Sequence, residues 1–285
     1  MTQRAKVGLP FVIVCGCAGA TALLGRMGTG DQLPSVKVVR AATLDANVAD
    51  QNEQFARTDP LRFLQHCLDY HRAHVRDYRC TFIKQESVQG TRLPAQVADV
   101  RFREEPFSVD MTFTRNVGEC KRALYVAGRW VDAQGNELAL AKPGGAILRA
   151  FLPQIKQPIH GRRAQQASRR TIDQFGFSES LELILKYSRK AQAEGKLKLE
   201  YVGRGAIGGR PTYVFERHLP YTGDETDYPD RLLVFHIDRQ YLVPTACYCY
   251  ADEARQALLG SYLYTDIEMN PRYTDDDFDP DKLDF

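Results

Sequence analysis

The chain has 285 residues, of which 44% are apolar and 26% are charged, and its formal net charge is +2. This composition is ordinary for a globular protein and excludes extended disorder as the general state of the chain. The first 26 residues hold three basic residues and no acidic one, which leaves 35 basic against 36 acidic residues in the rest. A body so close to neutral argues against nucleic acid or another polyanion as the main partner.

The first 26 residues have the pattern of a signal peptide or an N-terminal membrane anchor. A short basic stretch over 1–6 precedes apolar and small residues over 7–24. Three outcomes remain open: cleavage at the A-x-A site over 18–20, lipidation of Cys17, and retention as an anchor, since 18 apolar residues just reach the length of a membrane span. We expect an exported protein of the periplasm or cell envelope, in which a flexible tether over 27–58 leads to a single domain over 59–285.

The domain is predicted to open with a helix that begins at Asp59-Pro60 and runs to about Arg76. Cys67, His71 and His74 lie on one side of this helix, where three metal ligands could meet. Two of them fall within the apolar stripe and no fourth ligand is near, so we predict packing and no metal site.

A β-meander should follow, with strands at 78–88, 95–104, 107–114, 121–127 and 130–139. In the third strand, alternation places Phe107, Val109, Met111 and Phe113 on one face and polar residues on the other. This apolar face is expected to line either a core or a cavity.

Residues 142–172 interrupt the strand pattern with seven basic residues, no acidic residue and several prolines and glycines, and a short helix is expected at 146–152. Such an insertion is either a solvated loop or a lid that contacts anionic head groups. The candidate contacts in the second case are Arg162, Arg163, Arg169 and Arg170.

A second helix is predicted over 172–194, followed by strands at 196–203, 212–218, 231–238, 242–251 and 260–269. About ten strands and two main helices, with no βαβ alternation, predict an α+β fold dominated by one curved antiparallel sheet. Five of the seven cysteines lie beyond the leader, and their spacing fits no disulfide framework. The acidic tail lacks the glycine and glutamate of a calcium loop and should pack through Phe278 and Phe285.

Motifs that carry catalysis are missing from the sequence. The G-x-G-x-x-G match over 203–208 precedes a strand and lacks the helix N-terminus on which phosphate binding depends. No nucleophile is paired with a base at a recognisable spacing. We therefore predict a protein that is not an enzyme and that has no cofactor, and a thiol- or metal-dependent reaction at Cys80 or His71 is the less favoured alternative.

Several stretches resemble a bacterial exported family of unknown function, number 1571: residues 78–86, residues 106–109 with Met111, and Leu124-Tyr125 with Gly128. The resemblance extends over about 60–285. More distantly, the C-terminal strands are similar to the LolA, LolB and RseB group. That similarity implies an unclosed β-barrel with helices on its concave side, able to accept acyl chains.

The leading hypothesis is an exported, non-enzymatic binding protein that accepts a lipid or the acyl part of a lipoprotein. The side chains expected to line its interior are Phe107, Met111, Phe113, Tyr125 and Trp130, because aromatic residues and methionine offer large, adaptable apolar surfaces. The alternative is a cell-envelope interaction or sensor protein whose interior is an ordinary filled core. The oligomeric state does not follow from the sequence.

Overall fold

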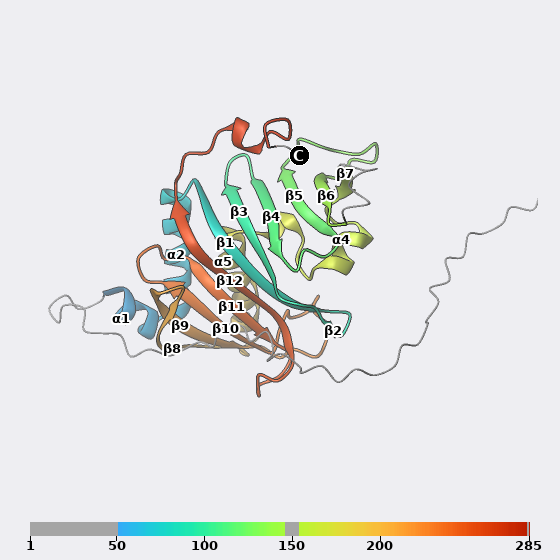
Figure 1. Ribbon diagram of the computed structural model, residues 1–285. Coiled ribbons are helices and arrows are strands. Elements are labelled where there is room, and N and C mark those ends of the chain that lie inside the picture. Colours follow the sequence, from blue (N-terminus) through green and yellow to red (C-terminus); the bar gives the residue numbers. More distant parts are fainter. Residues whose placement is uncertain (1–50, 146–153, 284) are drawn as a thin grey trace, which may run out of the picture. The chain divides into compact units, whose positions relative to one another are not determined.

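The computed structural model describes residues 51–145, 154–283 and 285. Within these residues the chain forms one 12-stranded antiparallel sheet that does not close, with helices packed against it (Figure 1). The α+β class and the open, curved sheet that the sequence predicts are confirmed, with 12 strands where about ten were expected. The two additional strands have two and four residues, too few for a period to be recognised in the sequence.

The strands are β1 (Asp77–Val88), β2 (Thr91–Arg92), β3 (Gln96–Arg103), β4 (Ser108–Arg115), β5 (Cys120–Val126), β6 (Leu138–Pro143), β7 (Ile155–Pro158), β8 (Lys198–Ile207), β9 (Arg210–His218), β10 (Leu232–Asp238), β11 (Pro244–Tyr250) and β12 (Leu258–Met269). The helices are α1 (Gln51–Thr58), α2 (Pro60–His74), α4 (Arg162–Ala167) and α5 (Phe177–Ala193), with 3-10 turns η1 (Ile172–Gln174) and η2 (Asp275–Phe278).

The sheet consists of two meanders joined at its centre. Its strand order is β7-β6-β5-β4-β3-β1-β12-β11-β10-β9-β8, with β2 paired to β1 outside this path. The central strand β1 pairs with β3 on one side and with β12, the last strand of the chain, on the other. The short β7 and the longer β8 are the two edges.

Two predicted boundaries are corrected by the structure. The strand expected at 130–139 is instead β6, because Asp132 closes a turn in which its Oδ1 accepts the amides of Gln134 (2.9 Å) and Asn136 (2.8 Å). The tether expected over 27–58 ends earlier, since α1 is helical and buries Ala56. The carboxylate of Glu53 accepts hydrogen bonds from Tyr201 (2.7 Å) and Arg204 (2.8 Å). The spacing of hydrophobic residues in the sequence does not predict these polar contacts.

Three expected features lie outside the described residues: the leader over 1–26, the tether over 27–50, and the whole of the short helix at 146–152. Among the described residues, none of the helices has the length and hydropathy to cross a bilayer.

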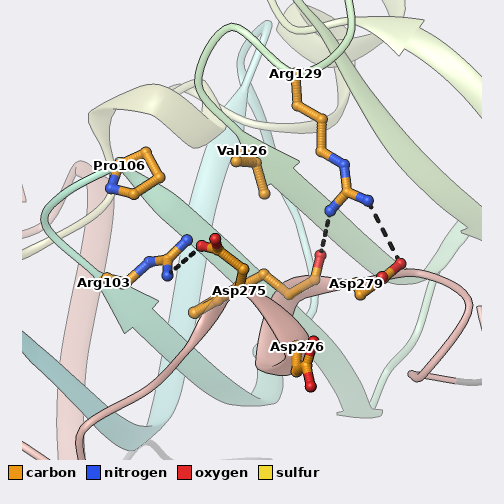
Figure 2. A pocket seen from close by; sticks show the side chains of 8 residues that line it. Arg103, Pro106, Val126, Arg129, Asp275, Asp276 and Asp279 are labelled. Atoms are coloured by element: carbon orange, nitrogen blue, oxygen red, sulfur yellow. Dashed lines mark hydrogen bonds and ion pairs between the residues drawn. The ribbon is translucent and has the colours of Figure 1, made fainter.

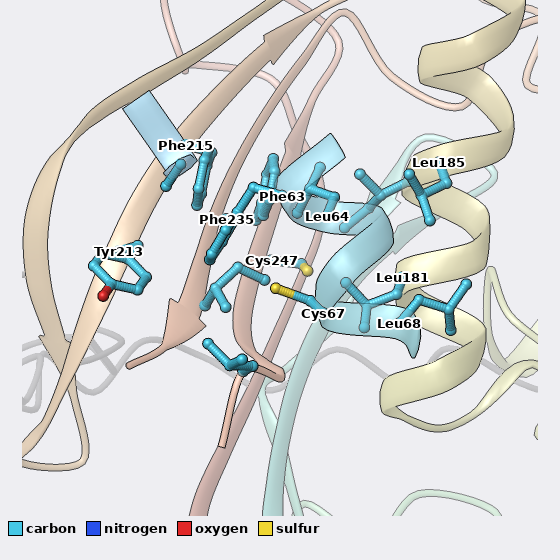
Figure 3. Packing of buried hydrophobic residues seen from close by; sticks show 14 of the residues in the cluster. Phe63, Leu64, Cys67, Leu68, Leu181, Leu185, Tyr213, Phe215, Phe235 and Cys247 are labelled. Atoms are coloured by element: carbon cyan, nitrogen blue, oxygen red, sulfur yellow. The ribbon is translucent and has the colours of Figure 1, made fainter. Parts of the chain in front are cut away.

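Helices α2 and α5 pack on one face of the sheet, which we call the inner face. Figure 3 shows Phe63 and Leu64 of α2 beside Leu185 of α5, with Phe215 and Phe235 of the strands beneath them. Phe63 stacks on Phe215 at 5.7 Å, and Phe215 stacks on Phe235 at 5.1 Å. Helix α2 begins where the sequence predicts, with the Asp59 side chain accepting the amide of Arg62 at 3.1 Å.

A buried ion pair fastens α5 to the sheet. Arg217 of β9 donates from Nη2 to both carboxylate oxygens of Asp230 at 3.1 Å, and from Nη1 to the carbonyl of Ile184 in α5 at 3.1 Å. Both charged side chains are almost fully buried. Such a pair adds little stability compared with apolar residues, but removal of one partner leaves a charge without compensation.

We expect Asp230→Asn to lower the free energy of unfolding by about 3–5 kcal/mol, because the Arg217 guanidinium would stay buried without its counter-charge. Urea unfolding monitored by circular dichroism measures this change. The control Glu200→Gln removes an exposed carboxylate of β8 and should change stability by less than about 0.5 kcal/mol. A loss below about 1 kcal/mol in Asp230→Asn would contradict the role given to the pair.

Candidate functional site: an aromatic interior and the strap that covers it

The inner face of β1, β3 and β4 carries a dense aromatic cluster. Tyr78 stacks between Phe102 (4.7 Å between ring centroids) and Phe177 (4.3 Å). Phe82 meets Phe175 edge-on at 5.0 Å. Two of these rings, Phe175 and Phe177, come from outside the sheet and cover the other three.

The covering segment runs from Ser168 to Ser178, and we call these residues the strap. It contains no strand, and it joins α4 to the first turn of α5 through η1. Gly176 separates the two inserted rings with φ +132°, and a Cβ at this position would lie 3.1 Å from the ring of Phe102. Only glycine combines this backbone conformation with such a close approach to the sheet.

One end of the strap is held by a buried carboxylate, Glu86, near the end of β1. Its oxygens accept hydrogen bonds from the Ser168 hydroxyl (2.7 Å), the Tyr262 hydroxyl (2.8 Å) and the Lys84 ammonium (3.0 Å). The backbone amide of Arg169 adds a fourth at 3.3 Å. Burial opposes the charge of Glu86, but Lys84 and these hydrogen bonds outweigh it and lower the pKa of Glu86 below its ordinary value.

Arg169 extends this anchor toward the loop that precedes β10. Its side chain is only 3% exposed and pairs with Glu225 at 2.9 Å, and it donates to the carbonyl of Pro229 at 3.1 Å. The guanidinium lies over Gly260 of β12, where a Cβ would approach Nη1 to 3.0 Å. Here the absence of a side chain makes room for the arginine.

The other end of the strap is held by Glu104, directly after β3. Its Oε1 lies 2.6 Å from Nε2 of His71 in α2 and accepts the hydroxyl of Ser178 in α5 at 2.9 Å. This carboxylate therefore joins the sheet to both helices at the N-terminus of α5, where a negative charge is favourable.

A second acidic side chain near this end has an unusual pKa. Burial, together with the neighbouring carboxylates of Glu182, Glu104 and Asp173, raises the pKa of Glu179 to about 7. Ionisation of Glu179 near neutral pH therefore adds a repelling charge close to the Glu104 anchor.

Four of the five residues predicted to line the interior lie together. Met111 and Phe113 belong to the aromatic cluster, and Phe107 contacts the rings of both Phe102 (5.2 Å) and Tyr125 (5.9 Å). All four pack against neighbouring side chains of the inner face.

Trp130 lies apart from these four. It packs with Leu124, Val126 and Phe278 on the opposite face of the sheet, which we call the outer face. The turn at Asp132 interrupts the strand expected at 130–139, so Trp130 is not part of a strand that faces the interior.

The four arginines proposed for head-group contacts differ in exposure and in their partners. Arg162 and Arg163 are exposed on α4, whereas Arg169 is committed to Glu225 and Arg170 is half-buried. Only the first two are free to meet an anionic group without a rearrangement of the strap.

Burial favours the neutral form of the thiols in the described part of the chain. Burial raises the pKa of Cys67, Cys80 and Cys247 well above the ordinary thiol value, and that of Cys249 to about 11. All five cysteines beyond the leader are free thiols. Over residues 51–145 and 154–285 with the exception of 284, no three metal-ligating side chains gather in one place.

A pocket of about 360 Å³ lies on the outer face, on the opposite side of the sheet from the four clustered residues of the predicted lining (Figure 2). Its walls combine basic, acidic and apolar side chains from β3, β5 and the C-terminal residues: Arg103, Pro106, Val126, Arg129, Asp275, Asp276, Phe278 and Asp279.

Sequence reasoning missed Glu86, Glu104 and Gly176 as the residues that hold the strap. For Glu86 a signal was present, because strict alternation from Tyr78 places this charged residue at an inward position of β1. For Glu104 and Gly176 the partners lie far apart in the chain, and the sequence carries no comparable signal.

Comparison with known proteins identifies the family. The model of the family described as "Protein of unknown function (DUF1571)" matches residues 75–285. The chain belongs to this family. The match includes β1, both carboxylates that hold the strap and the C-terminal residues, whereas α1 and α2 precede it. No curated protein matches the chain in sequence.

Solved structures provide distant similarities. MucB is 15% identical over 78% of this chain, with a TM-score of 0.44, and the chain spans 63% of the MucB length, less than two thirds. The lipoprotein LppX of Mycobacterium tuberculosis is 14% identical over 76% of this chain and 99% of its own, with a TM-score of 0.39. A LolA superfamily protein of Nitrosomonas europaea is 8% identical over 76% and 98%, with a TM-score of 0.25. Similarities this distant do not assign a function to this chain.

We expect the stabilisation that Glu86 provides to disappear in acid. Because its pKa in the folded protein lies below the unfolded value of about 4.3, the contribution is complete above about pH 5 and is lost as the pH falls through the folded pKa. Urea unfolding of the wild type and of Glu86→Gln at pH 7 and pH 3.5 measures this. The difference between the two proteins should shrink at pH 3.5, and an equal difference at both values would contradict the ionised state of Glu86.

Proposed function

We propose that this family member is an exported binding protein whose inner-face aromatic cluster accepts the acyl part of a lipid or lipoprotein when the strap moves away. The observation that supports this proposal most is the way in which the strap is attached to the sheet. Residues 168–178 are held on the sheet by side-chain hydrogen bonds to Glu86 and Glu104, and not by strand pairing. Such a cover can separate while the sheet beneath it stays intact.

The surface beneath the strap suits an acyl chain. It consists of large aromatic side chains together with Met111, whose flexible thioether adapts to irregular ligands. An acyl chain gains about 0.8 kcal/mol for each buried methylene, so a chain of about 14 carbons gains on the order of 10 kcal/mol. Withdrawal of Phe175 and Phe177 costs about 2–3 kcal/mol for each ring, so exchange of the strap for a ligand is energetically reasonable.

The position of the basic residues agrees with this function. Arg162 and Arg163 on α4 are exposed and lie a few residues before the strap. They are placed to meet the anionic head group of a ligand whose acyl part enters beneath the strap. The apolar leader over 1–26 agrees with export to the cell envelope.

A second candidate function is favoured by the close packing of the interior. Four of the five predicted lining residues belong to inner-face clusters that also include residues of the strap, and the 360 Å³ pocket lies on the outer face. A cell-envelope interaction or sensor protein with a filled core and no small ligand has these features. In that case the strap is a permanent part of the core.

Uptake of a fluorescent fatty acid by the purified full chain separates the two functions. The carrier should take up the probe at one site per chain, and Glu86→Gln should take it up more readily because one anchor of the strap is weakened. Organic extracts of protein purified from its native host should also contain a lipid in a reproducible stoichiometric amount by mass spectrometry.

The control Glu200→Gln, on the exposed face of β8, should bind the probe as the wild type does. Near-UV circular dichroism verifies that each variant keeps its aromatic packing, so that binding by an unfolded chain is excluded. Clean extracts together with no uptake in either the wild type or a folded Glu86→Gln would contradict the carrier and support the filled core.

A further inference from the structure

The C-terminal residues 271–283 and 285 form an arm that lies on the outer face. The arm leaves β12 at Asn270, and its first amides, those of Arg272 (3.0 Å) and Tyr273 (3.3 Å), are held by the carboxylate of Asp77 in β1. Beyond Tyr273, the backbone hydrogen bonds of the described arm are internal, such as those that close η2. The arm therefore does not extend the sheet.

Three arginines bind the arm to the sheet. Arg103 at the end of β3 donates to Asp275 at 2.8 Å, and Arg129 after β5 donates to the carbonyl of Phe278 at 3.0 Å. Arg122 of β5 donates to the carbonyl of Leu283 at 2.6 Å, while its other nitrogens hold the carboxylate of Asp110 at 2.7 Å. The row of arginines matches a ligand that carries carboxylates and free carbonyl groups.

An aromatic ring anchors the arm between these polar contacts. Phe278 is 1% exposed and packs on Leu124, Val126 and Leu140 of β5 and β6. The guanidinium of Arg103 lies 5.0 Å from the centre of its ring, a cation–π distance. The surface of the sheet beneath the arm thus combines an apolar site for Phe278 with basic side chains around it.

The arginines and the apolar residues beneath Phe278 line a groove on the outer face, and the arm does not fill it. The pocket of about 360 Å³ remains between the arm and the sheet, beside Arg129 and Pro106 (Figure 2). Arg103 is nine-tenths buried in the pocket wall, yet its Nε has no hydrogen-bond partner in the described part of the chain. The Asp275 side chain that meets Arg103 is 90% exposed, so water and salt compete for this contact.

We propose that this groove is a peptide-binding surface for a partner protein, and that the arm is its internal occupant. The groove fits an extended segment in which an aromatic side chain is flanked by carboxylates, the chemistry that Asp275, Phe278 and Asp279 display. The unfilled pocket offers such a segment contacts that the arm does not make. The proposal concerns the outer face and does not depend on uptake of acyl chains on the inner face.

The covalent link gives the arm an advantage over a free peptide. An attached segment acts at an effective concentration on the order of millimolar, so a partner must bind more contacts than the arm or meet a loosened arm. Removal of the Phe278 ring loosens the arm because its main apolar anchor is lost, while the three arginines of the groove stay in place.

A labelled peptide with the sequence of residues 271–285 tests the groove by fluorescence anisotropy with the full chain. We expect Phe278→Ala to bind this peptide at least 10-fold more tightly than the wild type. A peptide that carries alanine at the position of Phe278 should lose that gain, and Arg129→Met in the Phe278→Ala background should weaken binding several-fold.

The matched control is Phe235→Ala, which removes a buried ring from the inner-face core and leaves the arm intact. It should bind the peptide no better than the wild type. The proposal is wrong if Phe278→Ala is folded by circular dichroism and binds no better than the wild type, or if Phe235→Ala binds equally well. Dimerisation of Phe278→Ala without peptide binding would assign the groove to a second copy of the chain and would also overturn it.

Discussion

A buried carboxylate at an inward position of the central strand determines how the interior is closed. Glu86 lies near the end of β1, where it pairs with Gly260 of β12, two residues beyond the last residue of β1 that pairs with β3. A lone charge there would cost several kcal/mol, so the fold must supply donors. It does so with Lys84 and Tyr262 from the sheet and with Ser168 from the strap. The hydrogen bond that Ser168 donates to the Glu86 carboxylate thus determines where the strap begins on the sheet.

The rest of the inner face follows from that closure. The strap continues from Ser168 across the aromatic cluster, inserts Phe175 and Phe177, and ends at Ser178 on Glu104. Its hold on the sheet therefore combines polar contacts at the two ends with ring packing in the middle. Polar contacts of this type are strong in a dry site and weaken as soon as water enters. A ligand that offers apolar surface to the cluster competes with the rings alone.

The two faces of the sheet are closed by different physical means. On the inner face the cover carries rings between the buried carboxylate of Glu86 in β1 and the half-buried carboxylate of Glu104 just after β3. On the outer face the relation is reversed, since the sheet provides arginines and the arm provides the carboxylates. Both covers are segments without strands, laid on a sheet whose own hydrogen bonds are complete without them. The sheet thus carries a separate cover on each of its two faces.

The sequence predicts most of the scaffold and little of its covers. Alternation predicts the bounds of β1, β3, β4 and β12 closely. Each of these strands buries one face, so apolar and polar residues alternate along its sequence. The period fails for β7, which has four residues, and for Trp130, whose place depends on a turn. It also cannot show that Glu86 meets Ser168, since those residues are 82 positions apart and their contact exists only in the folded chain.

The central claim is that the strap opens as a unit of its own while the sheet stays folded. Hydrogen–deuterium exchange of the full chain, followed by mass spectrometry of peptides that cover residues 168–178, β1 and β4, tests it most directly. The strap amides should exchange by local opening at least 100-fold faster than those of the two strands, with a rate that rises further in Glu86→Gln. Exchange of strap and strands together, at the rate of global unfolding, would contradict the claim.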